Sequence, residues 1–117
     1  MRSWVEISRS AWLQNWEILS RVVAPAKAMA VIKANAYGHG LLHCAKLAEE
    51  AGVTLLGVDS VEEALQLREE GIKAQILILG FIPEDQLHEL AKFVILYLIK
   101  YQNFLFHTQR FLHFLLV

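Results

Sequence analysis

The sequence predicts an α/β fold in which strand–helix units repeat and their strands form a parallel sheet. Three short apolar runs support this prediction, because each is continuous rather than alternating, as in strands buried on both faces of a parallel sheet. Their centres lie near Val31, Leu56 and Leu77. The intervals, about 25 and about 21 residues, leave room for one helix between successive strands. We therefore expect a leading helix followed by three βα units.

The leading helix precedes the first strand. Ser8 or Ser10 can cap it, because a serine hydroxyl accepts a hydrogen bond from a free amide of the first turn. Large apolar residues then recur every three or four positions, which defines one face of a helix and favours a role in the core over a role in ligand binding. These residues are Trp12, Trp16, Leu19 and Val23. Pro25 ends the helix.

The first strand covers residues 28–32, and Lys33 stands at its carboxyl end. Parallel α/β folds bind their ligands at this end of the strands. A partly desolvated lysine amine there is suited to Schiff-base chemistry, although a lysine at a strand end is by itself more often a surface residue. Tyr37 would lie on the same side of a helical turn and could donate to a phosphate. Gly38 and Gly40 permit a close approach of the backbone to a ligand.

The second unit follows the same plan. A helix begins after Gly40 and stops at Gly52, and the second strand covers residues 53–58. Ser60 and Glu63 then fit a capping box, in which Ser60 accepts from Glu63 and the Glu63 side chain reaches back. Asp59 is better explained by a turn or capping role than as a catalytic acid.

The third unit has its strand at residues 75–79, which Gly80 terminates. Pro83 stands near the first turn of a further helix, where its missing N–H costs nothing. The apolar run at residues 93–99 can serve as a fourth strand. The sequence thus accounts for three to four βα units.

Metal-binding and redox patterns are weak. His39 and His43 are four residues apart, but no carboxylate or second cysteine joins them in a ligand pattern, so we expect no metal site. Cys44 is the single cysteine and is best interpreted as a small buried apolar residue in a reducing cytosol. The net charge of −1 offers no basic face for nucleic acid.

The end of the chain differs in composition from the rest. All 12 acidic residues lie at or before Glu89, whereas five of the six phenylalanines lie in residues 93–117. Three interpretations stay open: out-of-frame or truncated coding sequence, a helix completing a small domain, and a membrane anchor. Polar residues break every window near the roughly 20 apolar residues that a spanning helix needs, so we expect no membrane span.

The string from Lys33 to Gly40, Lys-Ala-Asn-Ala-Tyr-Gly-His-Gly, resembles the cofactor-lysine signature of the alanine racemases. The resemblance implies a pyridoxal 5'-phosphate (PLP) enzyme with a (β/α)8 TIM barrel, of which this chain holds the first part. It implies that Lys33 carries PLP, that Tyr37 contacts its phosphate and that Leu79 lines the cofactor pocket. It also implies a cytoplasmic homodimer that interconverts L-alanine and D-alanine, supplying D-alanine for peptidoglycan.

The resemblance covers residues 1–93 as a barrel segment, and residues 94–117 depart from the family. A complete (β/α)8 barrel needs roughly 250 residues, so 117 residues give only its opening units. The family's second acid/base, a tyrosine from a C-terminal domain of the other subunit, has no counterpart here. We therefore expect an incomplete, inactive fragment. The alternatives are a non-catalytic PLP-binding barrel protein and a remnant without ligand.

Overall fold

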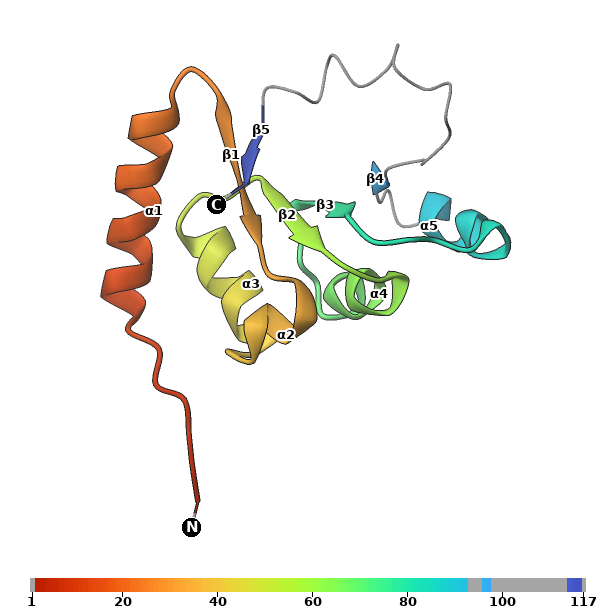
Figure 1. The fold of residues 1–117 in the computed structure, drawn as a ribbon, viewed down its shortest axis with the longest axis horizontal. Helices are drawn as coiled ribbons and strands as arrows, with labels where there is room; N and C mark the ends of the chain where they lie inside the picture. Colours follow the sequence, from red (N-terminus) through yellow and green to blue (C-terminus); the bar gives the residue numbers. More distant parts are fainter. Residues whose placement is uncertain (1, 93–95, 98–113, 117) are drawn as a thin grey trace.

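The computed structural model describes residues 2–92, 96–97 and 114–116, and it has the α/β organisation that the sequence predicts (Figure 1). Its elements, in chain order, are α1 (Arg9–Val23), β1 (Lys27–Val31), α2 (Lys33–Tyr37), α3 (Leu41–Glu50), β2 (Leu55–Val58), α4 (Val61–Glu69), β3 (Gln75–Ile78), the 3-10 helix η1 (Glu84–Gln86), α5 (Leu87–Lys92), β4 (Leu96–Tyr97) and β5 (Phe114–Leu116). Each predicted strand–helix unit is present.

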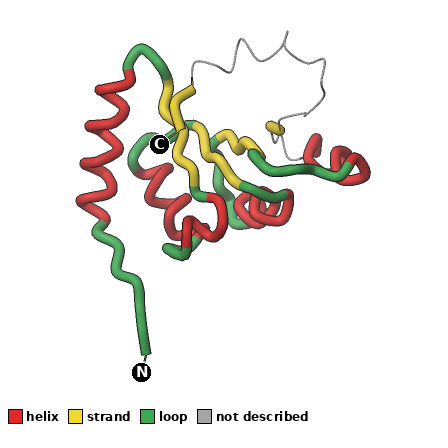
Figure 2. The backbone as a smooth tube through the Cα atoms, in the orientation of Figure 1, coloured by secondary structure: helices red, strands yellow, loops and turns green. Residues whose placement is uncertain are grey.

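The sheet has the order β4-β3-β2-β1-β5, and every described strand pair is parallel. Figure 2 shows the strands side by side. From the β1 side of the sheet to the β4 side, the helices follow in the order α1, α3, α4 and α5. β4 lies within the run predicted as a fourth strand; the rest of that run is outside the described residues. The prediction of a parallel sheet is therefore confirmed.

The tail contributes one described element. β5 pairs with β1, with Leu115 beside Ala28 and Leu116 beside Met29. A helical interpretation of the tail is thus wrong for Leu115 and Leu116, while residues 98–113 lie outside the described part of the chain. The pairing is non-local, so the local spacing of apolar residues could not reveal it.

Alternation along the strands gives the sheet two apolar faces. One face joins the helices in the main core and is formed by Ala28, Ala30, Ile32, Leu56, Val58, Ile76 and Ile78. The other face carries a smaller cluster of Met29, Leu55 and Leu77, with Val31 and Leu79 packed against it. A sheet buried on both faces is what the continuous apolar strands predict.

Helix α1 begins and ends as expected. The hydroxyl of Ser8 accepts from the amide of Ala11 at 3.3 Å, and the helix stops at Val23, before Pro25. The rings of Trp12 and Trp16 stack with centroids 6.1 Å apart. Of the predicted apolar stripe, only Trp16 is buried. Helix α1 therefore packs closely against the rest of the fold near Trp16 and less closely elsewhere.

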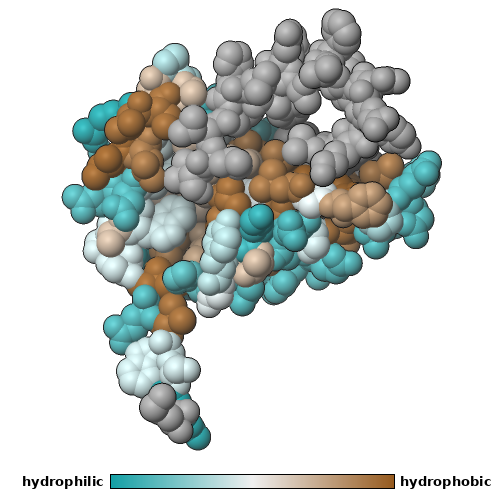
Figure 3. Space-filling model, viewed as in Figure 1, coloured by the Kyte–Doolittle hydropathy of each residue, from teal (hydrophilic) through white to brown (hydrophobic). Residues whose placement is uncertain are grey.

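Helix α1 also leaves apolar side chains at the surface. Ile18, Leu19 and Val22 are exposed there, and Figure 3 shows apolar colouring over this helix. None of the helices in the described part of the chain is long and apolar enough to cross a membrane.

Candidate active site

The carboxyl ends of β1, β2 and β3 meet at one edge of the sheet, and Lys33 lies there. The amide of Ile32 donates to the carbonyl of Gly57 at 2.8 Å, and the amide of Leu79 donates to the carbonyl of Val58 at 2.8 Å. These bonds continue the ladder past the formal ends of the strands and bring Lys33 and Leu79 to the same edge. The predicted position of Lys33 is therefore confirmed, while its role stays a prediction.

Lys33 is half-buried. Lys33 comes just after β1, whose residues Met29 and Val31 lie on the sheet face that also carries Leu79. The described residues form no ion pair with the Lys33 amine.

A left-handed turn follows Lys33. Four successive residues have φ near +50°, namely Ala34 at 51°, Asn35 at 54°, Ala36 at 52° and Tyr37 at 54°. For residues other than glycine this conformation costs roughly 1–2 kcal/mol each, so it persists only where its surroundings impose it. A helical turn between Lys33 and Tyr37 was expected, and the structure gives it the opposite hand.

Backbone hydrogen bonds close this turn. The carbonyl of Ile32 accepts from the amide of Ala36 at 2.8 Å, and the carbonyl of Asn35 accepts from Gly38 at 3.1 Å and from Gly40 at 3.0 Å. Gly38 and Gly40 have φ of 90° and 100°, which explains why glycine stands at both positions. The positive φ values agree with the conformational freedom of glycine, while the close approach to a ligand stays a prediction.

The side chain of Asn35 links the turn to the next helix. Its Oδ1 accepts from the amide of Leu41 at 2.8 Å, at the start of α3. The N-cap residue Gly40 has no side chain for this purpose, so Asn35 supplies the capping oxygen from six residues away in the sequence. Asparagine is also one of the few residues that tolerates a left-handed φ.

Glu63 holds the turn from the other side. Its Oε1 accepts from the amide of Asn35 at 3.0 Å, and its Oε2 accepts from the amide of Asp59 at 2.8 Å. The Ser60 hydroxyl accepts from the amide of Glu63 at 3.2 Å, as the capping box predicts. In a complete capping box the Glu63 carboxylate would accept from the amide of Ser60. Here it accepts instead from the amides of Asp59 and Asn35. It thereby connects α4 to the turn after Lys33.

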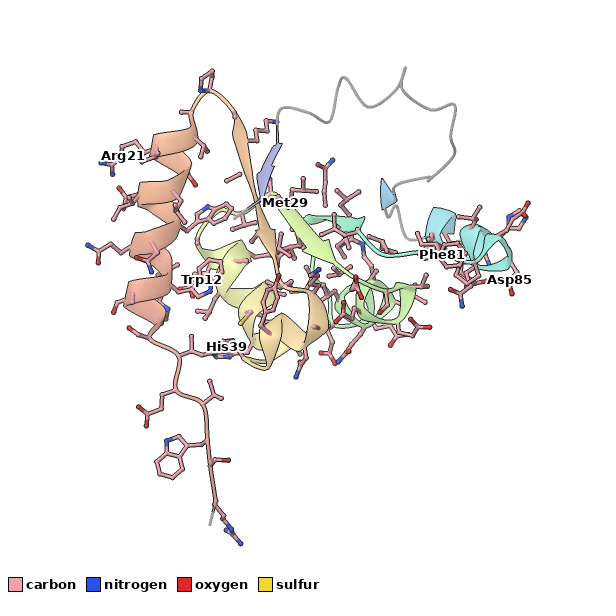
Figure 4. The ribbon with its side chains drawn as sticks, viewed as in Figure 1. Trp12, Arg21, Met29, His39, Phe81 and Asp85 are labelled. Atoms are coloured by element: carbon pink, nitrogen blue, oxygen red, sulfur yellow. The ribbon has the colours of Figure 1, made fainter. Side chains whose placement is uncertain are left out.

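Tyr37 is 61 % exposed and borders a pocket of about 330 Å³ between α1, β1 and the turn. Trp12, Trp16 and His39 also line this pocket, and Figure 4 shows Trp12 on α1 and His39 beyond the turn. Neither Lys33 nor Leu79 lines it. The structure therefore brings Lys33 and Leu79 to one edge and places Tyr37 beside a separate hollow.

Leu79 is half-buried against the smaller core cluster. Its Cδ1 would come 3.2 Å from a Cβ built on Gly57, so the absence of a side chain at Gly57 leaves room for Leu79. This contact places Leu79 on the sheet face of Met29 and Val31, the strand residues that precede Lys33.

The other candidate residues have structural surroundings. Cys44 is buried, and burial raises the pKa of its thiol. The Nδ1 of His39 bonds with the carbonyl of Ala36 at 2.9 Å. Within residues 2–92, 96–97 and 114–116, no three histidines, cysteines or carboxylates gather closely enough to hold a metal ion.

Two residues that shape the site, Asn35 and Glu63, were not among the site residues predicted from the sequence. Glu63 was recognised as part of a capping box, but its contact with Asn35 joins residues 28 apart and leaves no local signal. An asparagine ahead of two glycines does indicate a left-handed turn, because these residue types favour positive φ. That signal was available at Asn35.

Comparisons with known proteins agree with the resemblance. The family model for the alanine racemase N-terminal domain matches residues 7–105, which extends beyond residue 93, where we expected the resemblance to stop. The chain is 46 % identical over 89 residues to alanine racemase 1 of Caldanaerobacter subterraneus subsp. tengcongensis, covering 75 % of this chain and 23 % of that protein.

Solved structures give the same result. The alanine racemase of Bacillus anthracis with bound L-Ala-P superimposes with a TM-score of 0.77 at 37 % identity, covering 82 % of this chain and 25 % of that one. The alanine racemase of Bartonella henselae with covalently bound pyridoxal phosphate gives 0.72 at 33 % identity, covering 80 % and 27 %. The chain thus spans about a quarter of the length of these relatives.

Proposed function

The chain belongs to the alanine racemase family, whose N-terminal-domain model matches most of its length, and on that premise we propose that it carries the PLP-holding segment of an enzyme that interconverts L-alanine and D-alanine. One observation supports this proposal above the others. Lys33 stands at the carboxyl edge of a parallel sheet and is followed by a left-handed turn that is fixed from both sides. Ligands of parallel α/β folds bind at this edge.

The amine of Lys33 at the sheet edge supports a PLP site, although Tyr37 borders a separate hollow and would have to reach the phosphate from there. Lys33 would hold PLP covalently through its amine, Tyr37 would donate its exposed hydroxyl to the phosphate, and Leu79 would cover part of the ring and exclude water. The cofactor, when bound, withdraws electrons from the bonds of a substrate's α-carbon. The Lys33 amine would then take the α-proton from one face, or return it, as a general base and acid.

Inversion of the α-carbon needs a second proton carrier on the opposite face. We propose no residue of this chain for that role. Tyr97 lies in β4, in the sheet itself, and Tyr101 is outside the described residues. The 117 residues alone would therefore bind the cofactor without racemising alanine, and turnover would require a partner segment, as in the homodimer that the family resemblance implies.

We further propose that residues 1–93 form the barrel segment and that the tail, residues 94–117, departs from the family; because the family model reaches residue 105, the departure would be complete only beyond that position. A cytoplasmic location and a supply of D-alanine for peptidoglycan follow from the same family assignment and are part of this proposal.

The direct test is covalent labelling. The chain is mixed with PLP, reduced with borohydride, digested and examined by mass spectrometry. We expect a pyridoxyl mass on Lys33 that is absent from Lys33→Ala and retained in Lys73→Ala, because Lys73 is an exposed lysine away from the site. An unlabelled Lys33 would refute cofactor binding.

A second measurement separates racemase from mere cofactor carrier. D-alanine formation from L-alanine is followed with PLP present. Labelling without turnover above Lys33→Ala agrees with the proposal that the chain needs a partner segment. Turnover above that control would show that these residues suffice.

A further inference from the structure

The carboxylate of Glu63 receives two backbone amides from different parts of the chain. Asp59 lies beside the helix that Glu63 begins, whereas Asn35 lies 28 residues earlier, in the left-handed turn after Lys33. A helix cap accounts for the Asp59 contact. It does not account for the Asn35 contact, which is tertiary and reaches the candidate active site.

We propose that Glu63 is a positioning residue that imposes the left-handed turn and so fixes the direction in which the Lys33 amine and the Tyr37 hydroxyl are presented. This inference rests on the proposed function for its chemical meaning, since the amine is to meet the aldehyde of PLP. Its structural half, that Glu63 holds the turn, can be tested with no cofactor at all.

The turn needs such a contact because its own sequence does not favour it. Two alanines and a tyrosine take a positive φ that these residue types disfavour, and only the asparagine among the four tolerates it readily. Glu63 holds the amide of Asn35, and the Asn35 side chain in turn holds the amide of Leu41 at 2.8 Å. The turn is thereby tied to α4 on one side and to α3 on the other.

The two hydrogen bonds of Glu63 depend on its negative charge. Both carboxylate oxygens accept, one from each amide, and both hydrogen bonds are charge-assisted. A glutamine has the same shape but only one acceptor oxygen, so its NH₂ group would face one of the two N–H donors. Glu63→Gln therefore removes one contact and opposes it with a donor, with little change in volume.

Amide hydrogen exchange in the full chain, without PLP, tests the structural half. We expect exchange at Asn35 and Leu41 to become about 10- to 100-fold faster in Glu63→Gln, the change corresponding to one hydrogen bond to a charged group. The amide of Gln75, bonded to Thr54 in the sheet, should not change. Glu62→Gln is the matched control, because Glu62 is the neighbouring exposed acid in the same first turn.

Labelling with PLP and borohydride tests the positioning half. We measure the ratio of pyridoxyl label on Lys33 to label on Lys73, which a change in overall yield does not affect. We expect this ratio to fall at least about tenfold in Glu63→Gln and to stay at the wild-type value in Glu62→Gln. A role confined to capping α4 would leave the ratio unchanged.

The outcomes are distinct. Wild-type exchange at Asn35 and Leu41 in both Glu63→Gln and Glu63→Asp, or an unchanged labelling ratio, overturns the proposal. An unlabelled Lys33 in the wild-type chain refutes the proposed function, while the exchange measurement still decides whether Glu63 holds the turn.

If Glu63→Gln unfolds, so that Gln75 exchanges as fast as Asn35, then Glu63→Asp takes its place. Aspartate keeps an acid in the first turn of α4, where it favours the helix, and is one methylene shorter. We expect faster exchange at Asn35 with Gln75 still protected, and protection of Asn35 at the wild-type level would contradict the proposal.

Discussion

The backbone of Asp59 fills the space beside Gly80 that a side chain would need. A Cβ built on Gly80 would overlap the carbonyl oxygen of Asp59 and stand 3.0 Å from its Oδ1. Asp59 follows β2 and Gly80 follows β3, so the loops that border the candidate site pack backbone against backbone. The glycine that was expected to terminate a strand thus also permits this close approach.

Gly80→Ala should destabilise the chain, because the methyl group meets backbone that cannot rotate away. We expect the free energy of unfolding to fall by about 1–3 kcal/mol, as for other overpacked sites. Urea denaturation followed by circular dichroism measures this change. The control is Gly57→Ala, whose Cβ would have the flexible side chains of Met29 and Leu79 as its nearest neighbours, at 3.2–3.3 Å, and should cost less. Equal stability of Gly80→Ala and wild type would show that the loops can separate freely.

Glu49 should contribute more to stability than its neighbour Glu50. Its Oε1 accepts from the amides of Lys73 at 2.6 Å and Ala74 at 2.8 Å, which fixes the loop before β3. Arg68 donates to the carbonyl of Ala74 in the same loop at 2.8 Å. We expect Glu49→Ala to lower the free energy of unfolding by about 2 kcal/mol, because two amides lose a charged acceptor.

The matched change is Glu50→Ala. Glu50 forms an ion pair with Arg9, but both side chains are substantially exposed, at 41 % and 63 %, and exposed pairs contribute at most about 1 kcal/mol. Thermal or urea unfolding of the two variants shows which substitution lowers the free energy of unfolding more. A larger loss for Glu50→Ala than for Glu49→Ala would contradict this interpretation of the loop.

Local patterns predicted the regular elements because those elements depend on local causes. Ser8 and Ser60 cap helices where their sequences predict caps, and Gly52 follows the end of α3 with φ of 86°. The second strand was predicted from Val53, yet β2 begins at Leu55, because the amide of Val53 is taken by the carbonyl of Ala48 at 2.9 Å. The boundary of a strand thus shifts where a local hydrogen bond takes the amide that would otherwise pair with the neighbouring strand.

Non-local contacts set the rest. The hand of the turn after Lys33 depends on Glu63, and no spacing rule joins two positions 28 residues apart. The strand at Leu115 depends on pairing with β1, at the far end of the chain. The position of Lys33 was predictable from the end of an apolar run, whereas the contacts that orient it were not.

Trp16 should be the tryptophan that stabilises α1. It is 8 % exposed, whereas Trp4 is 76 % exposed in the segment before the helix. We expect Trp16→Ala to lower the free energy of unfolding by about 3 kcal/mol through lost burial and the cavity it leaves, and Trp4→Ala to change it by less than about 0.5 kcal/mol. Urea unfolding of both variants measures the difference, and similar losses would argue against the packing of α1 on the sheet.

Cys44 should make the stability of the chain depend on pH in the alkaline range. Burial raises the pKa of the Cys44 thiol above its ordinary value of 9.0, because the thiolate loses its hydration in the core. The folded state thus favours the protonated form. The resulting stability is fully present below the unfolded pKa and is lost as the pH rises through the folded pKa.

We therefore expect the free energy of unfolding to fall between about pH 9 and the higher folded value, and less steeply in Cys44→Ala, which has no thiol to ionise. Urea titrations at pH 7 and pH 10 give the loss of unfolding free energy for the wild type and for Cys44→Ala. The same burial predicts slow alkylation of Cys44 by iodoacetamide at pH 8, with full reactivity in urea. Alkylation of the folded chain at the rate of the unfolded one would place the thiol at the surface and contradict the packing of α3 against the sheet.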